Sequence, residues 1–311
     1  MQKRLFLKAL AAALAAMATG VQAAAPRPRV ALIMKSLANE FFLTMEKGAR
    51  THQQTNRARY ELLASGIKDE ADTAGQIRLI EQMIVARVNA IVVAPADSRA
   101  LVAAVKRAQQ AGIVVVNIDN QFDPAALKEK GITVPFVGPQ DRQGAAQVAA
   151  HVARSLKAGD KVAIIEGLAN ANNSRLRSAG FREAALAAGL NVVSVQNGDW
   201  EIDKASRVAA AMLRETPDLK AILCANDSMA LGAIAAIKSA GKTGKVKVGG
   251  FDNLSAVAPM LKDGRLAATA DQNAGQLAVH GIETALKLLN NRNALPGAVV
   301  ETPVALIAGR T

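Results

Sequence analysis

The residues that could do chemistry in this sequence stand where its apolar runs end. Val30–Met34 is an unbroken apolar run, and Lys35 and Asn39 follow it together with the adjacent aromatics Phe41 and Phe42. The length and β-branched residues of the run are typical of a strand buried on both faces. We therefore expect hydrogen-bonding groups and aromatic rings together at the carboxyl end of this strand, the edge at which open α/β sheets bind ligands.

Other apolar runs end in similar residues. The side chains that follow them are mainly carboxylates, amides and large aromatics: Asp119, Asn120, Trp200, Asn226, Asp227, Phe251, Asp252, Asp271 and Gln272. Planar groups that donate and accept hydrogen bonds, set beside flat apolar rings, suit a ligand with many hydroxyls and apolar C–H faces. We interpret the set as a binding site for a sugar or a polyol. A hydroxyl that misses its partner leaves a buried polar group unpaired at a cost of roughly 1 to 3 kcal/mol, so such a site can separate epimers.

Several of these residues also have an ordinary structural interpretation. Asp227 and Asp252 could be N-caps of the helices that follow them, since aspartate is preferred at that position. Phe41 and Phe42 could equally be core residues. Trp200 lies in a Gly-Asp-Trp segment, where a lone large aromatic is less expected, and this favours a role in binding.

The histidines and the cysteine indicate neither catalysis nor metal binding. His52, His151 and His280 fall within predicted helices at unrelated spacings, and Cys224 is the only cysteine. The sequence contains no CxxC, HExxH, GxSxG, Walker or GxGxxG motif, and these motifs supply the usual metal, nucleophile and nucleotide sites. The sequence therefore predicts no catalytic residue, no metal and no cofactor.

Residues 1–23 have the features of a secretory signal peptide. A basic start, an apolar stretch over 5–18 and a small-residue site at 21–23 follow one another, in the order that such signals show. We expect cleavage near Ala23 and an exported, soluble protein, most simply in a bacterial periplasm. The formal net charge is +12, but the lysines and arginines are dispersed without interleaved aromatics, which argues against nucleic-acid binding.

Apolar strands alternate with predicted helices along the rest of the chain. The strands are expected at 30–34, 60–64, 89–95, 113–118, 161–166, 191–196, 219–224, 246–251 and 266–270. This alternation indicates βαβ units and parallel sheets. Two such series, separated near residues 135–139, predict an α/β fold of two doubly wound domains. A last strand-like stretch at 298–307 could return across the domain boundary.

A set of short segments is specific for one family when the segments are taken together. They are SLANEFF (36–42), VVAPADS (92–98), NIDNQ (117–121), EGLANANNSRLRSAGF (166–181), NGDW (197–200), CANDSMALGA (224–233), GGFDN (249–253) and LAATADQN (266–273). With these segments the chain resembles the type I periplasmic solute-binding proteins of ABC transporters, in the group around the D-ribose and D-allose binding proteins. The match covers nearly all of the expected mature chain.

The resemblance implies two doubly wound parallel-sheet lobes joined by a three-strand hinge. The first lobe would contain residues 24–136 and 273–301, and the second would contain 137–272 and 302–311. A ligand would bind in the cleft between the lobes. It would favour the closed state, because it touches both lobes only there.

The resemblance also assigns roles to residues by position. Asn39, Phe41 and Phe42 match the first ligand-binding loop, with the rings packing against the sugar. The other implied contacts are the hydroxyl-binding aspartate Asp119, the arginine Arg175 reaching in from the second domain, the stacking aromatic Trp200, and the polar residues Asn226, Asp252 and Gln272.

Lys35 and Asn120 set this chain apart from the ribose binders, and both belong to the expected site. Lys35 stands where ribose binders carry a small polar residue, and it resembles the allose type instead. Asn120 stands where ribose binders carry an arginine. We expect an aldohexose such as allose, or a pentose, with a sugar alcohol as the alternative.

The function that the resemblance implies is capture and delivery rather than catalysis. The closed protein, expected to be a monomer, would pass its ligand to the membrane permease of an ABC importer; presentation to a chemoreceptor is an alternative role. A sugar-responsive transcription regulator of the same fold would need a helix-turn-helix before Val30, where the export signal stands. An exported enzyme would need a paired nucleophile and base, which the sequence does not show.

Overall fold

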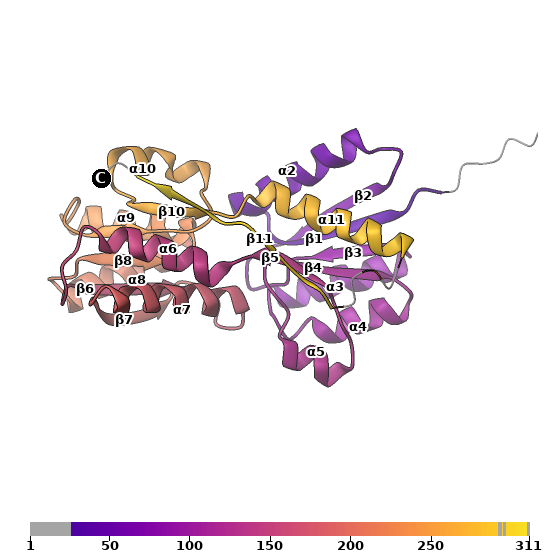
Figure 1. Cartoon of the computed structure of the whole chain (residues 1–311), viewed down its shortest axis with the longest axis horizontal. Coiled ribbons are helices and arrows are strands. Elements are labelled where there is room, and N and C mark those ends of the chain that lie inside the picture. The colour runs from indigo at the N-terminus through magenta and orange to yellow at the C-terminus, as the bar shows by residue number, and fades with distance from the viewer. Residues whose placement is uncertain (1–25, 292–293, 295–296, 310–311) are drawn as a thin grey trace, which may run out of the picture.

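Two lobes lie side by side along the long axis of the molecule (Figure 1), and each is built around one six-stranded sheet. The structure is a computed structural model, and it describes residues 26–291, 294 and 297–309. The expected signal peptide, residues 1–23, lies outside the described residues.

The first sheet is parallel throughout and has the order β11-β5-β4-β3-β1-β2. Its strands are β1 (Arg29–Ser36), β2 (Glu61–Ile67), β3 (Ala90–Val93), β4 (Val114–Ile118), β5 (Phe136–Pro139) and β11 (Val299–Thr302). One face is covered by α2 (Glu40–Thr55) and α11 (Ala274–Asn290). The other face is covered by α3 (Thr73–Val85), α4 (Val102–Gln110) and α5 (Pro124–Lys130).

The residues of β1 show why this sheet needs apolar side chains at consecutive positions. Val30, Leu32 and Met34 pack into the cluster formed with α2 and α11, whereas Ala31 and Ile33 pack into the cluster formed with α3 and α4. Successive side chains of a strand point to opposite faces, and helices cover both faces here. An alternating apolar and polar pattern would bury polar groups on one of them.

The second sheet has the order β12-β10-β9-β8-β6-β7, and β12 runs antiparallel to β10. Its strands are β6 (Lys161–Glu166), β7 (Asn191–Asn197), β8 (Ala221–Cys224), β9 (Lys247–Gly249), β10 (Ala268–Asp271) and β12 (Ala305–Ala308). Its helices are α6 (Asp141–Ala153), α7 (Asn172–Ala187), α8 (Ile202–Glu215), α9 (Asp227–Ser239), the 3₁₀ turn η1 (Ser255–Val257) and α10 (Ala258–Asp263).

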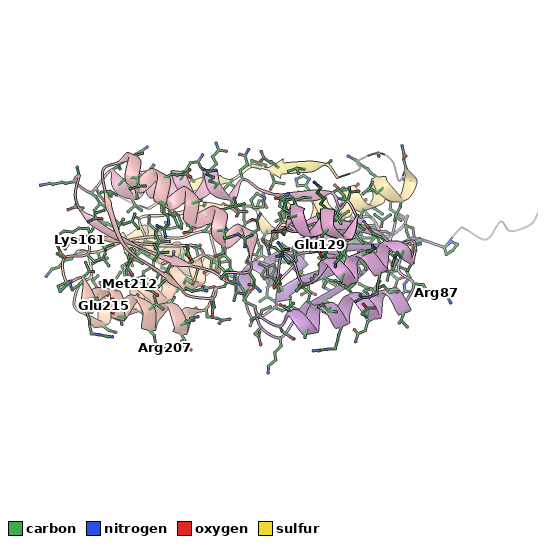
Figure 2. All side chains as sticks on the ribbon, turned by 90° about the horizontal axis from the view of Figure 1, so that it is seen from below. Arg87, Glu129, Lys161, Arg207, Met212 and Glu215 are labelled. Carbon is green, nitrogen blue, oxygen red and sulfur yellow. The ribbon has the colours of Figure 1, made fainter. Side chains whose placement is uncertain are left out.

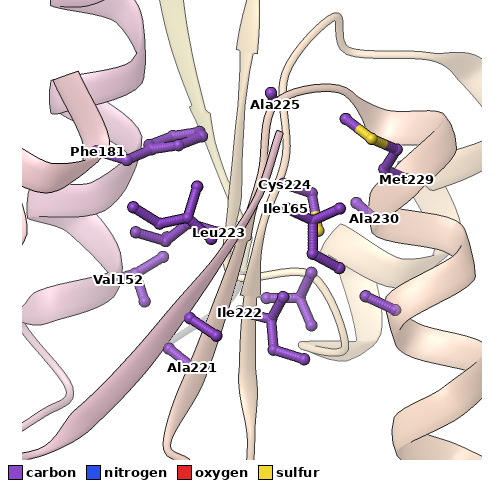
Figure 3. Close-up of a cluster of buried hydrophobic side chains, with 14 of the residues drawn as sticks. Val152, Ile165, Phe181, Ala221, Ile222, Leu223, Cys224, Ala225, Met229 and Ala230 are labelled. Atoms are coloured by element: carbon purple, nitrogen blue, oxygen red, sulfur yellow. The ribbon is translucent and has the colours of Figure 1, made fainter. Parts of the chain in front are cut away.

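The core of the second lobe also lies on both sides of its sheet, as Figure 3 shows around β8. Leu223 lies on the side of Phe181, and Cys224 lies on the side of Met229 and Ala230. Each of these side chains is buried. Both lobes thus have the three-layer packing that parallel sheets require.

Three connections join the lobes, between β5 and α6, between β10 and α11, and between β11 and β12. They confirm the predicted fold of two doubly wound lobes with a three-stranded hinge. The expected boundary between the lobes at residue 136 lies at the first residue of β5, and this strand of the first sheet ends at Pro139.

The carboxyl ends of the two sheets face each other. Arg87, which precedes β3, and Lys161, which begins β6, lie at opposite ends of the long axis (Figure 2). The amino ends of the strands therefore point outward, and the loops that follow the strands meet in the middle of the molecule. This is the arrangement in which residues that follow strands in both lobes can form one site.

Candidate functional site

One cavity between the lobes collects most of the predicted binding residues. The first lobe contributes Lys35, Asn39, Phe41, Phe42, Glu70 and Asp119, and the second contributes Asn173, Arg177, Trp200, Asn226, Asp252 and Gln272. Of the residues expected to contact the ligand by resemblance, all except Asn120 and Arg175 line it. Asp227, Phe251 and Asp271, which the sequence also places after strands, do not line it.

The start of α2 delivers an amide and two rings to this cavity. Asn39 is the N-cap of α2, and its Oδ1 accepts a hydrogen bond of 3.0 Å from the backbone N–H of Phe41. The rings of Phe41 and Phe42 lie edge to face, with centroids 5.1 Å apart and an interplanar angle of 86°. Both rings belong to the core of the first lobe and also line the cavity, so the two interpretations of these residues hold together.

Lys35 and Asp119 form a buried ion pair in the first lobe. Lys35 Nζ lies 3.3 Å from Asp119 Oδ2, and the two side chains are 4% and 2% exposed. The same ammonium lies 5.5 Å from the ring centroid of Phe42 and 5.7 Å from that of Trp200. Lysine is rarely buried without a partner, and here it has a carboxylate from its own lobe and an aromatic face from the other.

Left-handed backbone conformations gather in the loops that follow the strands. The φ angle is +62° at Asp119, +71° at Trp200, +115° at Asp252 and +53° at Asn273. Such angles are uncommon for non-glycine residues, above all for bulky ones. They cost of order 1 to 3 kcal/mol each and are concentrated at functional sites, where the surrounding structure holds them in place.

In the second lobe, hydrogen bonds orient the amides that line the cavity. Asn226 is the N-cap of α9: its Oδ1 accepts from Met229 N at 2.9 Å, and its Nδ2 donates to Trp200 O at 3.4 Å. Gln272 Nε2 donates to Asp252 Oδ1 at 2.7 Å. These side chains are therefore held in fixed orientations before any ligand contact.

The arginine of this cavity is Arg177, and Arg175 lies outside it. Arg175 is exposed and donates only to Ala169 O and Asn172 Oδ1 among the described contacts, both at 3.2 Å. Arg177 is 2% exposed, with its Cζ 3.8 Å from the ring centroid of Phe251. The structure therefore places Arg177 at this cavity and Arg175, two positions earlier on the same helix, outside it.

Arg177 is held between two carboxylates. Its Nε donates to Asp141 Oδ1 at 2.7 Å, and its Nη1 donates to Asp252 Oδ1 at 3.4 Å and to Ala225 O at 3.0 Å. Charge-assisted hydrogen bonds of this kind are the strong ones. They fix the guanidinium against the wall of the cavity.

Asn120 does not line the cavity, although it follows Asp119 directly. Its side chain is fully buried, its Nδ2 donates to Pro95 O at 2.9 Å, and its Oδ1 accepts from Asn173 N at 3.1 Å. The structure therefore places Asn120 outside the cavity and at a contact between the lobes.

Three cavity residues were not predicted from the sequence, namely Glu70, Asn173 and Arg177. Glu70 follows β2, but the strand was expected to end at residue 64 and ends at Ile67 instead, which hid the carboxylate at its carboxyl end. Asn173 and Arg177 are four positions apart on α7, a spacing that places them on one helix face. This spacing is the feature of the sequence from which the two residues could have been predicted to lie together.

Burial shifts several carboxyl groups at this site toward their neutral forms. It raises the pKa of Glu70 to about 7, against the opposing effect of Lys35. It raises the pKa of Asp141 to about 6 and that of Asp252 well above its ordinary value, in both cases against Arg177. Carboxyl groups outnumber the two cations here. Both the neutral and the ionised form of a carboxyl group can hydrogen-bond a hydroxyl group of a ligand.

Unpartnered polar atoms are concentrated in the same cavity. Among the described residues, the buried side-chain atoms without a hydrogen-bond partner are Asp119 Oδ2, Asn173 Oδ1, Trp200 Nε1, Gln272 Oε1 and Thr302 Oγ1. All but Thr302, which lies at the end of β11, line the cavity. Asp119 Oδ2 still has the ion pair with Lys35. Buried polar groups are nearly always hydrogen-bonded in folded proteins, so three acceptors and one donor here call for partners from a bound molecule.

The lobes are closed tightly around this cavity. Its volume is about 20 Å³, which is the scale of one water molecule. Two cavities of about 480 Å³ lie on the hinge side, around Phe136 and Val299, but none of the unpartnered polar atoms belongs to a residue that lines them. Chemistry rather than size therefore locates the site, and a sugar-sized ligand can enter it only when the lobes move apart.

Within the described residues, no group of three or more histidine, cysteine, aspartate or glutamate side chains is placed to hold a metal ion. A separate observation concerns the membrane: none of the helices in the described part of the chain is both long and apolar enough to cross one.

Comparisons with known proteins show the family to which the chain belongs. Residues 30–293 match the family described as periplasmic binding protein domain. The D-ribose/D-allose-binding protein of Pseudomonas aeruginosa is 59% identical over 283 residues, which are 90% of this chain and 89% of that protein.

Two solved structures also match. An ABC transporter solute-binding protein from Burkholderia multivorans, with an unknown ligand represented as α-D-erythrofuranose, superposes with a TM-score of 0.89 and 58% identity, covering 91% of this chain and 100% of that one. A periplasmic solute-binding protein from Actinobacillus succinogenes with bound D-allose has a TM-score of 0.85 and 31% identity, covering 91% and 98%.

Proposed function

Since this chain belongs to the periplasmic binding protein family, we infer that it is the solute-binding component of an ABC importer. It captures a monosaccharide in the cleft between its lobes and delivers it for transport. The named relative binds D-ribose or D-allose, and a solved neighbour holds D-allose. An aldohexose such as allose, or a pentose, is the proposed ligand, and a sugar alcohol is the alternative.

The observation that carries this proposal is the set of unpartnered polar atoms from both lobes beside aromatic rings. Asp119 Oδ2, Asn173 Oδ1 and Gln272 Oε1 can accept hydrogen bonds and Trp200 Nε1 can donate one, but none of the four has a hydrogen-bond partner within the protein. A hydroxyl group both donates and accepts, so a polyhydroxylated ring can satisfy all four atoms at once. Leaving any of them unpaired costs roughly 1 to 3 kcal/mol.

The proposed roles of the cavity residues follow from their chemistry. Phe41, Phe42 and Trp200 face the C–H surfaces of the sugar ring. Lys35 and Arg177 donate hydrogen bonds, each already oriented by a carboxylate. The polar residues Asn39, Glu70, Asp119, Asn173, Asn226, Asp252 and Gln272 complete the contacts with hydroxyls.

Transport rather than catalysis is the proposed role of the site. Binding and release need only the opening and closing of the lobes, and a ligand that touches both lobes favours the closed form. We propose that the protein acts in the periplasm as a monomer, after removal of residues 1–23, and that its partner is a membrane permease. Presentation of the sugar to a chemoreceptor is the alternative role proposed for the same closed form.

Trp200 provides the test, because it is the only tryptophan and its ring lines the cavity. A titration of its fluorescence with D-allose, D-ribose, other hexoses and pentoses, and sugar alcohols should give a saturable change with one or a few of them. Trp200→Phe, followed by calorimetry, separates loss of signal from loss of binding. Folded protein that responds to no member of the panel in either assay would refute the sugar-binding proposal.

A further inference from the structure

Helix α7 begins at the boundary between the lobes without a cap of its own. Its N-cap residue, Ala171, has no side chain that can accept a hydrogen bond from the first turn. The first N–H groups of any helix lack partners within the helix, and an N-cap side chain normally supplies one. For α7 the acceptors must come from elsewhere.

The other lobe supplies them. Ser98 Oγ accepts from Asn172 N at 2.9 Å, and Asn120 Oδ1 accepts from Asn173 N at 3.1 Å. Asn172 and Asn173 are the first two residues of α7. Ser98 and Asn120 therefore take the place of the missing N-cap from across the cleft.

Both acceptors are positioned within the first lobe. Asn120 Nδ2 donates to Pro95 O at 2.9 Å, and Ser98 Oγ donates to Asn120 Oδ1 at 3.3 Å. The side chains of Ser98 and Asn120 are fully buried. Their own lobe keeps these side chains oriented when the lobes separate. They therefore lose little conformational freedom when the lobes close and α7 approaches them again.

The loop before α7 adds further contacts across the same edge. Ser98 N donates to Asn170 O at 3.0 Å, and Asn170 Nδ2 donates to Asp97 Oδ2 at 2.8 Å. Arg175 holds this loop from within the second lobe through Ala169 O. A continuous seam of hydrogen bonds thus joins the segment after β3 to the start of α7, and none of its members lines the ligand cavity except Asn173.

We propose that Ser98 and Asn120 form a latch that caps α7 only in the closed protein and thereby sets ligand affinity without touching the ligand. This inference rests on the proposed function. Contacts present only in the closed state raise its population, and the apparent affinity of a ligand scales with the population of the state that binds it. Ser98 and Asn120 are positioning residues, so their loss weakens all ligands by the same factor.

The test uses the full mature chain with D-allose and D-ribose as the probes. Ser98→Ala and Asn120→Ala remove the acceptors, and Ser98→Thr keeps the hydroxyl. Asp72→Ala is the matched control, because Asp72 Oδ1 caps α3 within one lobe by accepting from Gly75 N at 2.8 Å. Affinity, the dissociation rate and the distance between labels on the two lobes are measured for each variant.

Loss of an N-cap acceptor is expected to weaken both sugars by about 3- to 30-fold. The ratio of the two affinities should stay unchanged, the dissociation rate should rise, and the labels should report a larger open fraction. Ser98→Thr should bind as the wild type does. Asp72→Ala should lower the unfolding temperature and leave affinity and interlobe distance unchanged.

The outcomes separate the latch from the proposed function. If the wild-type protein binds sugar and the two alanine variants bind it equally well, the latch is overturned. A change in the ratio of D-allose to D-ribose affinity would also overturn it, because that result places these side chains in contact with ligand. If the wild-type protein binds neither sugar, nor any other member of the panel, the proposed function itself fails, whatever the interlobe distances show.

Discussion

Replacing Arg177 by methionine should reduce the stability and the ligand binding of this protein far more than the same change at Arg175. Methionine keeps much of the side-chain length and removes the charge. At Arg177 it removes the partner of Asp141 and of Asp252, at 2.7 and 3.4 Å, and the contact with the ring of Phe251. At Arg175 it removes two exposed hydrogen bonds of 3.2 Å.

The expected magnitude follows from the burial of the carboxyl groups that remain. Removing one partner of a buried ion pair costs about 3 to 5 kcal/mol, because an uncompensated charge stays behind. An exposed substitution away from the core changes stability by about 0.5 kcal/mol or less. Arg177→Met should therefore lower the free energy of unfolding by several kcal/mol more than Arg175→Met.

The loss of stability in Arg177→Met should depend on pH, and the raised pKa values of the two carboxyl groups determine its direction. The pKa values of Asp141 and Asp252 are already raised by burial, and loss of Arg177 raises them further. Carboxyl groups with raised pKa values in the folded state stabilise it while protonated and lose that contribution as pH rises through the folded pKa. The deficit of Arg177→Met should thus be smaller at pH 5 and larger at pH 8.

Urea unfolding of the sugar-free proteins at pH 5 and pH 8 measures both effects, and titration with D-allose measures the loss of binding. Arg175→Met should bind within about threefold of the wild type, a difference below 1 kcal/mol. Equal losses of stability at the two positions, or a deficit of Arg177→Met that does not change with pH, would refute the assignment of Arg177 as the buried partner of two carboxyl groups.

Three further results are expected. Burial raises the pKa of Glu70 to about 7, so the wild type loses stability as pH rises from about 4.5 to 7. Glu70→Gln keeps the side-chain oxygen that accepts from Asn39. The stability of Glu70→Gln relative to the wild type, measured by urea unfolding, should therefore increase across that pH range and then level off. Cys224 is fully buried and its thiol pKa is raised by burial, so a thiol reagent should label it only as fast as the protein unfolds. A Cβ at Gly48 would lie 2.5 Å from the Cα of Gly275, so Gly48→Ala should separate α2 from α11 and lower the unfolding temperature by several degrees, whereas Ala49→Gly should leave this contact in place.

The residues directly after strands were accessible to sequence analysis. Asp119 and Gln272 follow buried strands within one residue, and the period of the strands locates their carboxyl ends. Glu70 was missed because β2 carries half-buried residues toward its end, and the apolar run stops before the strand does. Predictions of this kind are as good as the estimate of where a strand ends.

Site residues on a helix are harder to predict from the sequence, as Arg175 and Arg177 show. Two positions along a helix differ by about 200° around its axis, so one of these arginines faces the cleft and the other faces solvent. The rotation of α7 is fixed by packing against α6, where a Cβ at Gly180 would lie 2.1 Å from Arg142 O. That contact joins residues far apart in the chain, and the period of the sequence does not reveal it.

The sequence by itself determined the alternation of strands and helices, the two parallel-sheet lobes and the polar and aromatic groups at the ends of the strands. Those properties depend on local periodicity and on which residues stand at a strand's end. The tertiary structure decided that Asp119 faces the cavity while Asn120 bonds to Asn173 across the cleft. It did so because the left-handed backbone at Asp119 and the closed approach of the lobes set these directions, and both depend on contacts between distant parts of the chain.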